Sequence, residues 1–249
     1  MSTYRRPAIV AQSSHAAARH AERALSSEAV ASFNRDGYCV VDLELTSQER
    51  AQLVEQGRVL HGMGYCRPGT AEAKNARGDA ICFAAAEQIG PELPAIGHCI
   101  QLLSCLVHEL SRQCDACSYP DAGKHLLVPD HVQFAAYKEG AHYASHRDNF
   151  MDGDARINER EWTAICYLNE GIYPRDGGAL RIHPHAPDDF RPEDLEPYVD
   201  VQPRAGTIVI FRSELLHQVR KKRQQTAASS NLSMPALSPY VPPPARFSR

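Results

Sequence analysis

The chain has 249 residues, a mass of 27.6 kDa, a formal net charge of −3 and 23% charged residues. This length is enough for one substantial domain with a sizeable core. The nearly balanced charge and the lack of a basic, aromatic-interleaved segment argue against a nucleic-acid partner. No apolar run approaches the roughly 18 residues that a membrane-spanning helix needs, so we expect no membrane partner.

The first half of the chain is predicted to be mainly helical. Apolar residues recur at helical spacing, Thr46 and Glu49 form a capping box, and Gly37 marks a turn or helix end. The predicted helices are 13–25, 28–34, 51–60 and 94–114, with short strands at 38–41 and around 77–83. Residues 1–20 have three arginines and no acid, but they resemble an organellar transit peptide only weakly. We therefore expect residues 1–26 to be a flexible extension rather than a targeting segment.

The second half of the chain has the period of strands. Short β-rich segments alternate with Gly, Pro and Asp turns at 131–137, 162–168, 179–183, 198–201 and 207–211. Helices followed by many short strands predict an α+β domain whose second half is a sandwich or a jelly roll. Residues 224–249 contain five Pro, five Ser and no acid, which favours a disordered tail over a core strand.

The eight cysteines fall mostly inside apolar segments, and no secretory apolar segment precedes them. This pattern favours reduced thiols in a reducing compartment, the cytoplasm, with the nucleus as a further option. Cys114 and Cys117 form a lone CxxC, and the sequence has no second CxxC to complete a zinc site.

His146 and Asp148 are the most informative pair in the chain. They lie two residues apart after an apolar run, so at strand spacing both side chains leave the backbone on one face. The best third ligand is His217, which follows the apolar run 206–211. Two imidazoles and one carboxylate on one side of a metal form the facial triad of non-heme Fe(II) oxygenases. Since an HxD pair arises by chance about once in a chain of this length, its neighbours must carry the inference.

Other candidate residues have a plainer interpretation beside the functional one. Tyr137 and Tyr167 fall on apolar strands, where a buried tyrosine is commonly a core residue with one satisfied hydroxyl. His183 and His185 flank Pro184, so a loop is favoured over a second metal site. His142 precedes His146 by four residues, but the segment between them is not helical in pattern.

An ordered series of residues resembles the 2-oxoglutarate-dependent prolyl 4-hydroxylases, and most closely the Egl-nine type that hydroxylates prolines in cytosolic and nuclear proteins. The resemblance covers about residues 33–219. It rests on 36–41, 77–79, Tyr137, Gly140, Tyr143, 146–149, Arg160, 167–169, 177–182, Pro203, Gly206, Phe211 and 217–219.

This resemblance implies a double-stranded β-helix, or jelly roll, over about 125–220, supported by N-terminal helices within a domain spanning 27–223. His146, Asp148 and His217 would hold Fe(II). Other residues match positions lining the 2-oxoglutarate pocket, namely Tyr137, Tyr167 and Leu180. Catalytic positions on the substrate side are matched by Tyr143, Arg160 and Asp79.

The resemblance also implies the partners of the site. Besides Fe(II), we expect 2-oxoglutarate and O2 as cosubstrates and L-ascorbate as an auxiliary reductant. The expected activity is hydroxylation of a protein substrate that presents a proline. The sequence indicates neither the target protein nor the oligomeric state.

The C-terminal part departs from the family pattern. In these enzymes a basic residue nine or ten positions after the last histidine, on the final strand, pairs with the distal carboxylate of 2-oxoglutarate. Thr226 and Ala227 occupy those positions here. Either Arg223 serves as the anchor through a shortened loop, or the C-terminus has left the family pattern through divergence or a shifted reading frame. A buried carboxylate without a partner costs roughly 3 to 5 kcal/mol.

Two rival functions follow from these observations. One is a dioxygenase of the same fold with another substrate, such as a small molecule. The other is a jelly-roll protein that binds metal but is catalytically impaired, because the 2-oxoglutarate anchor is missing.

Overall fold

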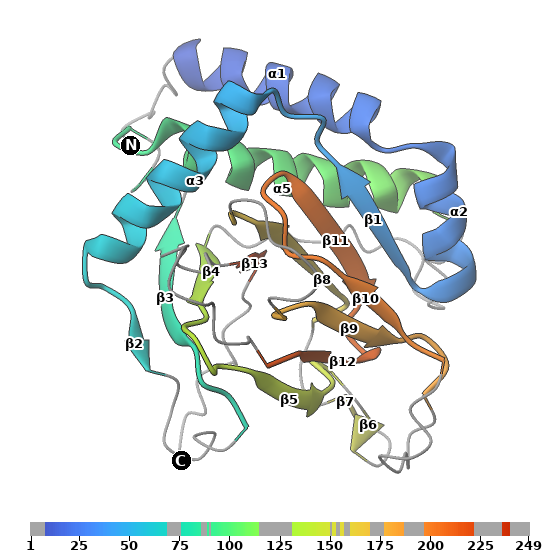
Figure 1. Cartoon of the computed structure of the whole chain (residues 1–249). Coiled ribbons are helices and arrows are strands. Elements are labelled where there is room, and N and C mark those ends of the chain that lie inside the picture. Colours follow the sequence, from blue (N-terminus) through green and yellow to red (C-terminus); the bar gives the residue numbers. More distant parts are fainter. Residues whose placement is uncertain are drawn as a thin grey trace, which may run out of the picture.

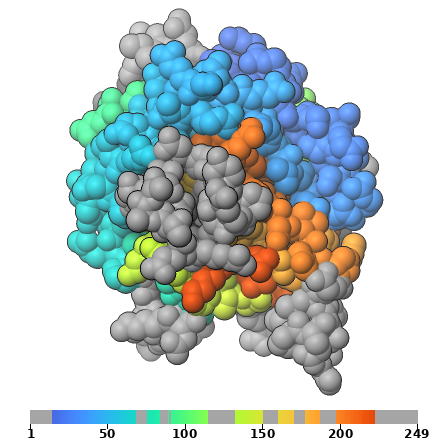
Figure 2. All heavy atoms as spheres, viewed as in Figure 1, coloured from blue at the N-terminus to red at the C-terminus, as the bar shows by residue number. Residues whose placement is uncertain are grey.

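The computed structural model describes residues 8–68, 76–85, 89, 91–114, 131–149, 151–152, 155–156, 160–169, 177–186, 197–221 and 236–239. Its helices lie together along one side of the strands (Figure 1). Figure 2 shows the same segregation on one face, with the early helices in blue and cyan on one side and the late strands in orange and red on the other.

The four predicted helices are present. They are α1 (Ala8–Ala24), α2 (Ser27–Asp36), α3 (Ser47–Gly62) and α5 (Pro94–Gln113), although α1 begins five residues and α3 four residues earlier than expected. The Thr46–Glu49 capping box opens α3, because each residue hydrogen-bonds the backbone N–H of the other. Gly37 ends α2 at φ 75°, a left-handed conformation that glycine adopts without steric cost.

The prediction of a flexible N-terminal extension is wrong for α1. Ala17 and Ala21, spaced one helical turn apart, are 0% and 1% exposed and belong to the main core, as does Leu25. Their small side chains allow α1 to lie against α5. The N-terminal helix is therefore part of the domain and supports the sheet from outside.

The strands form two main sheets and a small hairpin. The larger sheet has the order β1-β11-β8-β13-β4-β3-β2, the smaller one the order β10-β9-β12-β5, and β6 pairs with β7. Their bounds are β1 (Tyr38–Asp42), β2 (Arg67–Pro68), β3 (Ala80–Ala85), β4 (His131–Ala136), β5 (Tyr143–His146), β6 (Met151–Asp152), β7 (Ala155–Arg156), β8 (Trp162–Tyr167), β9 (Leu180–His183), β10 (Val199–Val201), β11 (Thr207–Arg212), β12 (Leu216–Val219) and β13 (Ala236–Pro239). All strand pairings among the described residues are antiparallel, which confirms the jelly-roll prediction.

Strand alternation in the larger sheet separates two cores. On β11, Ile208 and Ile210 face the helices, whereas Val209 and Phe211 face the smaller sheet. The inner cluster consists of Tyr167, Leu180, Ile182, Val201, Val209, Phe211 and Leu215. The interior between the sheets is thus lined by residues from both sheets, and the site lies at this interior.

The C-terminal segment contains a strand that the sequence analysis did not predict. Residues Ala236–Pro239 form β13, which pairs with both β4 and β8 and fills the gap between them. The expectation of a tail without a strand is therefore wrong for these four residues. The low strand propensity of a Pro- and Ser-rich segment is overridden because β13 finds hydrogen-bonding partners on both sides.

The remaining domain boundaries, 27–223 for the catalytic domain and 224–249 for the tail, stay predictions. Arg223 lies outside the described residues. Within the described ranges, no helix combines the length and apolar character that a bilayer crossing requires.

Candidate metal centre and active site

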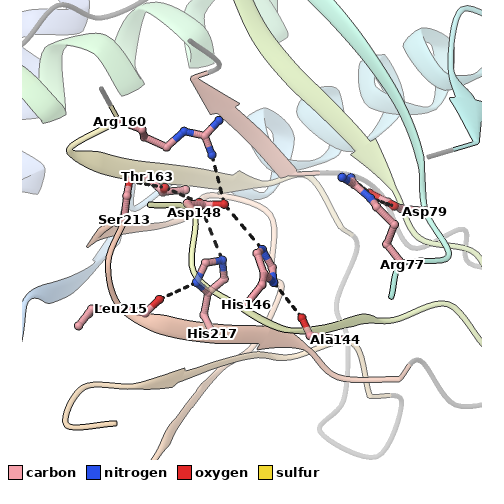
Figure 3. Close-up of polar contacts among 10 residues, drawn as sticks. All are labelled: Arg77, Asp79, Ala144, His146, Asp148, Arg160, Thr163, Ser213, Leu215 and His217. Atoms are coloured by element: carbon pink, nitrogen blue, oxygen red, sulfur yellow. Dashed lines mark hydrogen bonds and ion pairs between the residues drawn. The ribbon is translucent and has the colours of Figure 1, made fainter. Parts of the chain in front are cut away.

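Three side chains, two from neighbouring strands and one from the bend after β5, converge at the interior of the jelly roll. His146 ends β5, Asp148 lies in the bend that follows, and His217 is the second residue of β12. Since β12 pairs antiparallel with β5, His146 and His217 stand directly opposite each other. One ligand atom of each of the three residues lies within 4.8 Å of the others. Figure 3 shows the three side chains pointing toward one another, as the sequence predicts.

Both imidazoles are oriented by the backbone. His146 Nδ1 lies 2.8 Å from the Ala144 carbonyl, and His217 Nδ1 lies 2.9 Å from the Leu215 carbonyl. A carbonyl oxygen only accepts, so in the neutral rings Nδ1 carries the proton and donates it. Each Nε2 then presents its lone pair toward Asp148, which is the arrangement that metal-binding histidines use.

The charges of the site favour metal binding at neutral pH. Burial lowers the pKa of His217 to about 4, against the opposing effect of Asp148, so this ring is neutral. Burial would raise the pKa of Asp148, but the neighbouring His146, His217 and Arg160 side chains outweigh it and lower that pKa well below its usual range. A neutral His217 and an ionised Asp148, with His146 as the third donor, form a set that suits Fe(II).

A β-bulge places Tyr143 beside the metal ligands. Between the paired residues of β12 and β5, two steps along β12 match three steps along β5. Tyr143 and His146, three residues apart, would otherwise face opposite sides, but the extra residue brings them to one side. Their rings stack with centroids 3.8 Å apart. The bulge thus explains how a residue out of strand phase reaches the site.

The predicted substrate-side residues reach the centre in different ways. Arg77 makes two hydrogen bonds to Asp79, of 2.7 and 2.6 Å, and its guanidinium lies 4.5 Å from the Tyr143 ring centroid. The Asp79 side chain is 0% exposed, and the contacts of Arg77 with Tyr143 and of Tyr143 with His146 connect it to the centre. Arg160 lies closer, with one guanidinium nitrogen 3.2 Å from Asp148 Oδ1.

The predicted 2-oxoglutarate residues lie along the interior. Tyr167 and Leu180 belong to the inner cluster, whose member Phe211 packs edge-on against His217 with ring centroids 4.7 Å apart. Tyr137 directly follows β4, and burial raises its pKa and that of Tyr167 well above the usual value. Both phenols are therefore protonated at neutral pH and can donate hydrogen bonds. The assignment of Tyr137, Tyr167 and Leu180 to the 2-oxoglutarate pocket stays a prediction.

The other histidines do not form a second metal site among the described residues. His183 ends β9 and is 2% exposed, so its predicted place in a loop is wrong, whereas His185 lies in the turn that follows. Cys117 lies outside the described residues.

The sequence analysis missed two hydroxyl residues behind Asp148. Thr163 on β8 donates a 2.6 Å hydrogen bond to Asp148 Oδ2, and Ser213 lies 3.0 Å from the Thr163 hydroxyl. A usable signal was present, because Thr163 lies four residues before Tyr167 and strand alternation places both on the inner face.

Comparisons with known proteins agree with this geometry. Residues 132–232 match the profile of the 2OG-Fe(II) oxygenase superfamily. Egl nine homolog 1 of Homo sapiens is 31% identical over 192 residues, which cover 73% of this chain and 39% of the human protein. The chain thus spans well under half the length of this relative.

Two solved structures have the same fold. A Pseudomonas putida prolyl-4-hydroxylase is 27% identical, with a TM-score of 0.58 over 85% of this chain and 97% of the other. A Trichoplax adhaerens prolyl hydroxylase, solved with a hypoxia inducible factor peptide fragment, is 19% identical, with a TM-score of 0.59 over 94% and 92% of the two chains. With its facial triad between two antiparallel sheets, the chain belongs to the 2OG-Fe(II) oxygenase superfamily, and within it to the prolyl hydroxylase-like proteins of the Egl-nine kind.

Proposed function

We propose that this chain is an Fe(II)- and 2-oxoglutarate-dependent dioxygenase that hydroxylates prolyl residues of a protein substrate. The observation that carries the proposal is the placement of His146 opposite His217, with Asp148 as the single carboxylate between their Nε2 atoms. A triad on one face of a metal leaves the other coordination positions open for exchangeable ligands.

The residues of the chain hold and orient the reactants. The two imidazoles and Asp148 would bind Fe(II), and the bound iron with 2-oxoglutarate supplies the oxidising chemistry, in which O2 is consumed and succinate and CO2 are released. The phenols of Tyr137 and Tyr167 would donate hydrogen bonds to the carboxylates of the cosubstrate, and Leu180 would form an apolar wall. Burial of this interior keeps bulk water away from the centre.

The distal carboxylate of 2-oxoglutarate needs a cation. β13 occupies the place in the sheet where the final strand of a jelly roll closes the barrel, but its four residues, Ala-Leu-Ser-Pro, include no cation. We propose Arg223 as the anchor, because it is a cation close after β12 in the chain.

The substrate is proposed to be a polypeptide. The Trichoplax adhaerens protein was solved with a peptide fragment, which supports an extended peptide as the occupant of the corresponding site here. Arg160 and Tyr143, beside the metal ligands, would contact the target proline of the substrate. On the same family grounds we propose L-ascorbate as auxiliary reductant and a cytoplasmic location, with the nucleus as an alternative.

Release of succinate from 2-oxoglutarate tests this proposal. Purified protein with Fe(II), ascorbate and O2 is offered 2-oxoglutarate with and without proline-containing peptides, and peptide mass is measured in parallel. We expect succinate in amounts that match a 16 Da gain on proline, and neither product from His217→Ala. Succinate without any gain on a peptide would instead support a same-fold dioxygenase with another substrate. No succinate under any condition would support a metal-binding protein that lacks activity.

A further inference from the structure

Both oxygens of Asp148 already have a protein partner on the side away from the histidines. The Thr163 hydroxyl lies 2.6 Å from Oδ2, and an Arg160 nitrogen lies 3.2 Å from Oδ1. The bond from Thr163 is short, as expected for a hydroxyl that donates to an ionised carboxylate. The carboxylate is therefore held in one orientation by groups other than the histidines.

Ser213 fixes the direction of the Thr163 hydroxyl. An ionised carboxylate only accepts, so the Thr163 hydroxyl must donate its proton to Asp148. Its oxygen is then free to accept from Ser213, 3.0 Å away. Thr163 is 3% exposed and Ser213 is 0% exposed, so water does not compete for these bonds. The result is a relay from Ser213 to Thr163 to Asp148.

The backbone locks the same three segments together. The Asn149 N–H donates to the Ser213 carbonyl at 3.0 Å, and the Ser213 N–H donates to the Glu161 carbonyl at 2.9 Å. The Asn149 amide group also donates to the Arg160 carbonyl at 2.8 Å. The loop that carries Asp148, the start of β8 and the turn after β11 thus form one hydrogen-bonded frame, and the relay cannot shift without disturbing it.

We propose that Thr163, supported by Ser213, is a positioning residue that keeps Asp148 a single-oxygen metal ligand. This inference rests on the proposed function. With the Thr163 hydroxyl bound to Oδ2, Asp148 offers the metal Oδ1, the oxygen that also pairs with Arg160. A carboxylate bound to the metal through both oxygens would fill an additional position. The facial triad needs three open positions for a chelating cosubstrate and O2, so a second Asp148 oxygen on the metal would block turnover.

Metal binding without turnover provides the direct test. The probes are Mn(II) by calorimetry, for affinity, and Co(II) by visible absorption, which responds to coordination number. We expect Thr163→Val to weaken Mn(II) binding about 10- to 100-fold and to change the Co(II) spectrum. Thr163→Ser, which restores the hydroxyl, should bind within about threefold of the wild-type protein, and Ser213→Ala should weaken binding by a smaller factor than Thr163→Val.

A matched control separates this role from a general loss of stability. Ser32→Ala also removes a partly buried hydrogen bond, the 3.0 Å bond from the Ser32 hydroxyl to the Tyr38 carbonyl, but this bond is not made to a metal ligand. It should leave Mn(II) affinity and the Co(II) spectrum unchanged, with apo-protein unfolding temperatures recorded for all variants. Should Thr163→Val fail to fold, the contrast between Ser213→Ala and Thr163→Ser decides the matter.

Three results would overturn the inference. One is a folded Thr163→Val protein with wild-type Mn(II) affinity and Co(II) spectrum, and another is a Thr163→Ser protein as weakened as Thr163→Val. The third is a wild-type protein that binds no Mn(II), which would overturn the proposed function as well. A wild-type protein that binds Mn(II) and depends on Thr163 but releases no succinate would refute only the proposed function.

Discussion

The ion pair between Arg77 and Asp79 makes a strong prediction about stability. It is bidentate, at 2.7 and 2.6 Å, with side chains 14% and 0% exposed. Removing one partner of such a pair leaves the other charge buried without compensation, which costs about 3 to 5 kcal/mol. Because Arg77 retains some contact with solvent, we expect a loss of about 3 kcal/mol for Asp79→Asn or for Arg77→Met.

The expected change is large enough to measure by thermal unfolding. For a chain of this size, 1 kcal/mol corresponds to about 2 to 4 °C in Tm, so each single variant should unfold about 6 to 12 °C lower. The double variant Arg77→Met with Asp79→Leu replaces both charges by apolar groups and should recover most of the loss. The control is Glu55→Gln, which breaks the exposed ion pair of Arg58 and Glu55 on α3, with side chains 37% and 63% exposed. It should lower the free energy of unfolding by no more than about 1 kcal/mol.

The same pair is expected to affect the metal centre indirectly. Arg77 lies over the Tyr143 ring, and Tyr143 stacks on His146 at 3.8 Å. Asp79→Asn should therefore also weaken Mn(II) binding, by a smaller factor than loss of a metal ligand. If both single variants unfold within 1 kcal/mol of the wild-type protein, or the double variant is less stable than either, the reasoning from burial is refuted.

Two further predictions concern the cosubstrate and the pH dependence of stability. Tyr167→Phe removes a phenol donor from the proposed 2-oxoglutarate pocket, so KM for 2-oxoglutarate should rise about tenfold or more. The control is Tyr198→Phe, because the Tyr198 ring stacks on Arg181. An unchanged KM in Tyr167→Phe would contradict the assignment. The hydrogen bond from Arg181 lowers the pKa of Asp200, so this contribution to stability is complete above the unfolded-state pKa of about 4 and is lost as pH falls through the lower folded-state pKa. In chemical denaturation, Asp200→Asn should be less stable than the wild-type protein by about 1 kcal/mol at pH 7. This difference should shrink toward pH 3. A difference that is the same at both pH values would count against a stabilising Arg181–Asp200 pair.

Local signals in the sequence were sufficient for the helices and for the metal ligands. The Thr46–Glu49 capping box and Gly37 act within a few residues, so their effects could be read directly and are confirmed. His146, Asp148 and His217 were identified from spacing and from family resemblance, and the structure brings them together.

Features that depend on distant partners could not be predicted from local pattern. β13 has a poor strand sequence and exists as a strand because β4 and β8 offer hydrogen bonds on both sides. The small side chains of α1 predicted a helix but not its burial, which results from the packing of α5 against it. Thr163 and Ser213 are 50 residues apart in the chain, and only the pairing of β8 with β11 and the turn that follows brings their hydroxyls together.

The convergence of the three ligands on one ion is tested most directly by metal stoichiometry. Anaerobic titration with Fe(II) should give one ion bound per chain for the wild-type protein. His146→Ala, Asp148→Ala and His217→Ala should each lose this site while remaining folded, and His185→Ala, in the turn after β9, should keep it. Binding of Fe(II) that persists in His217→Ala, or a folded wild-type protein that binds none, would contradict the account.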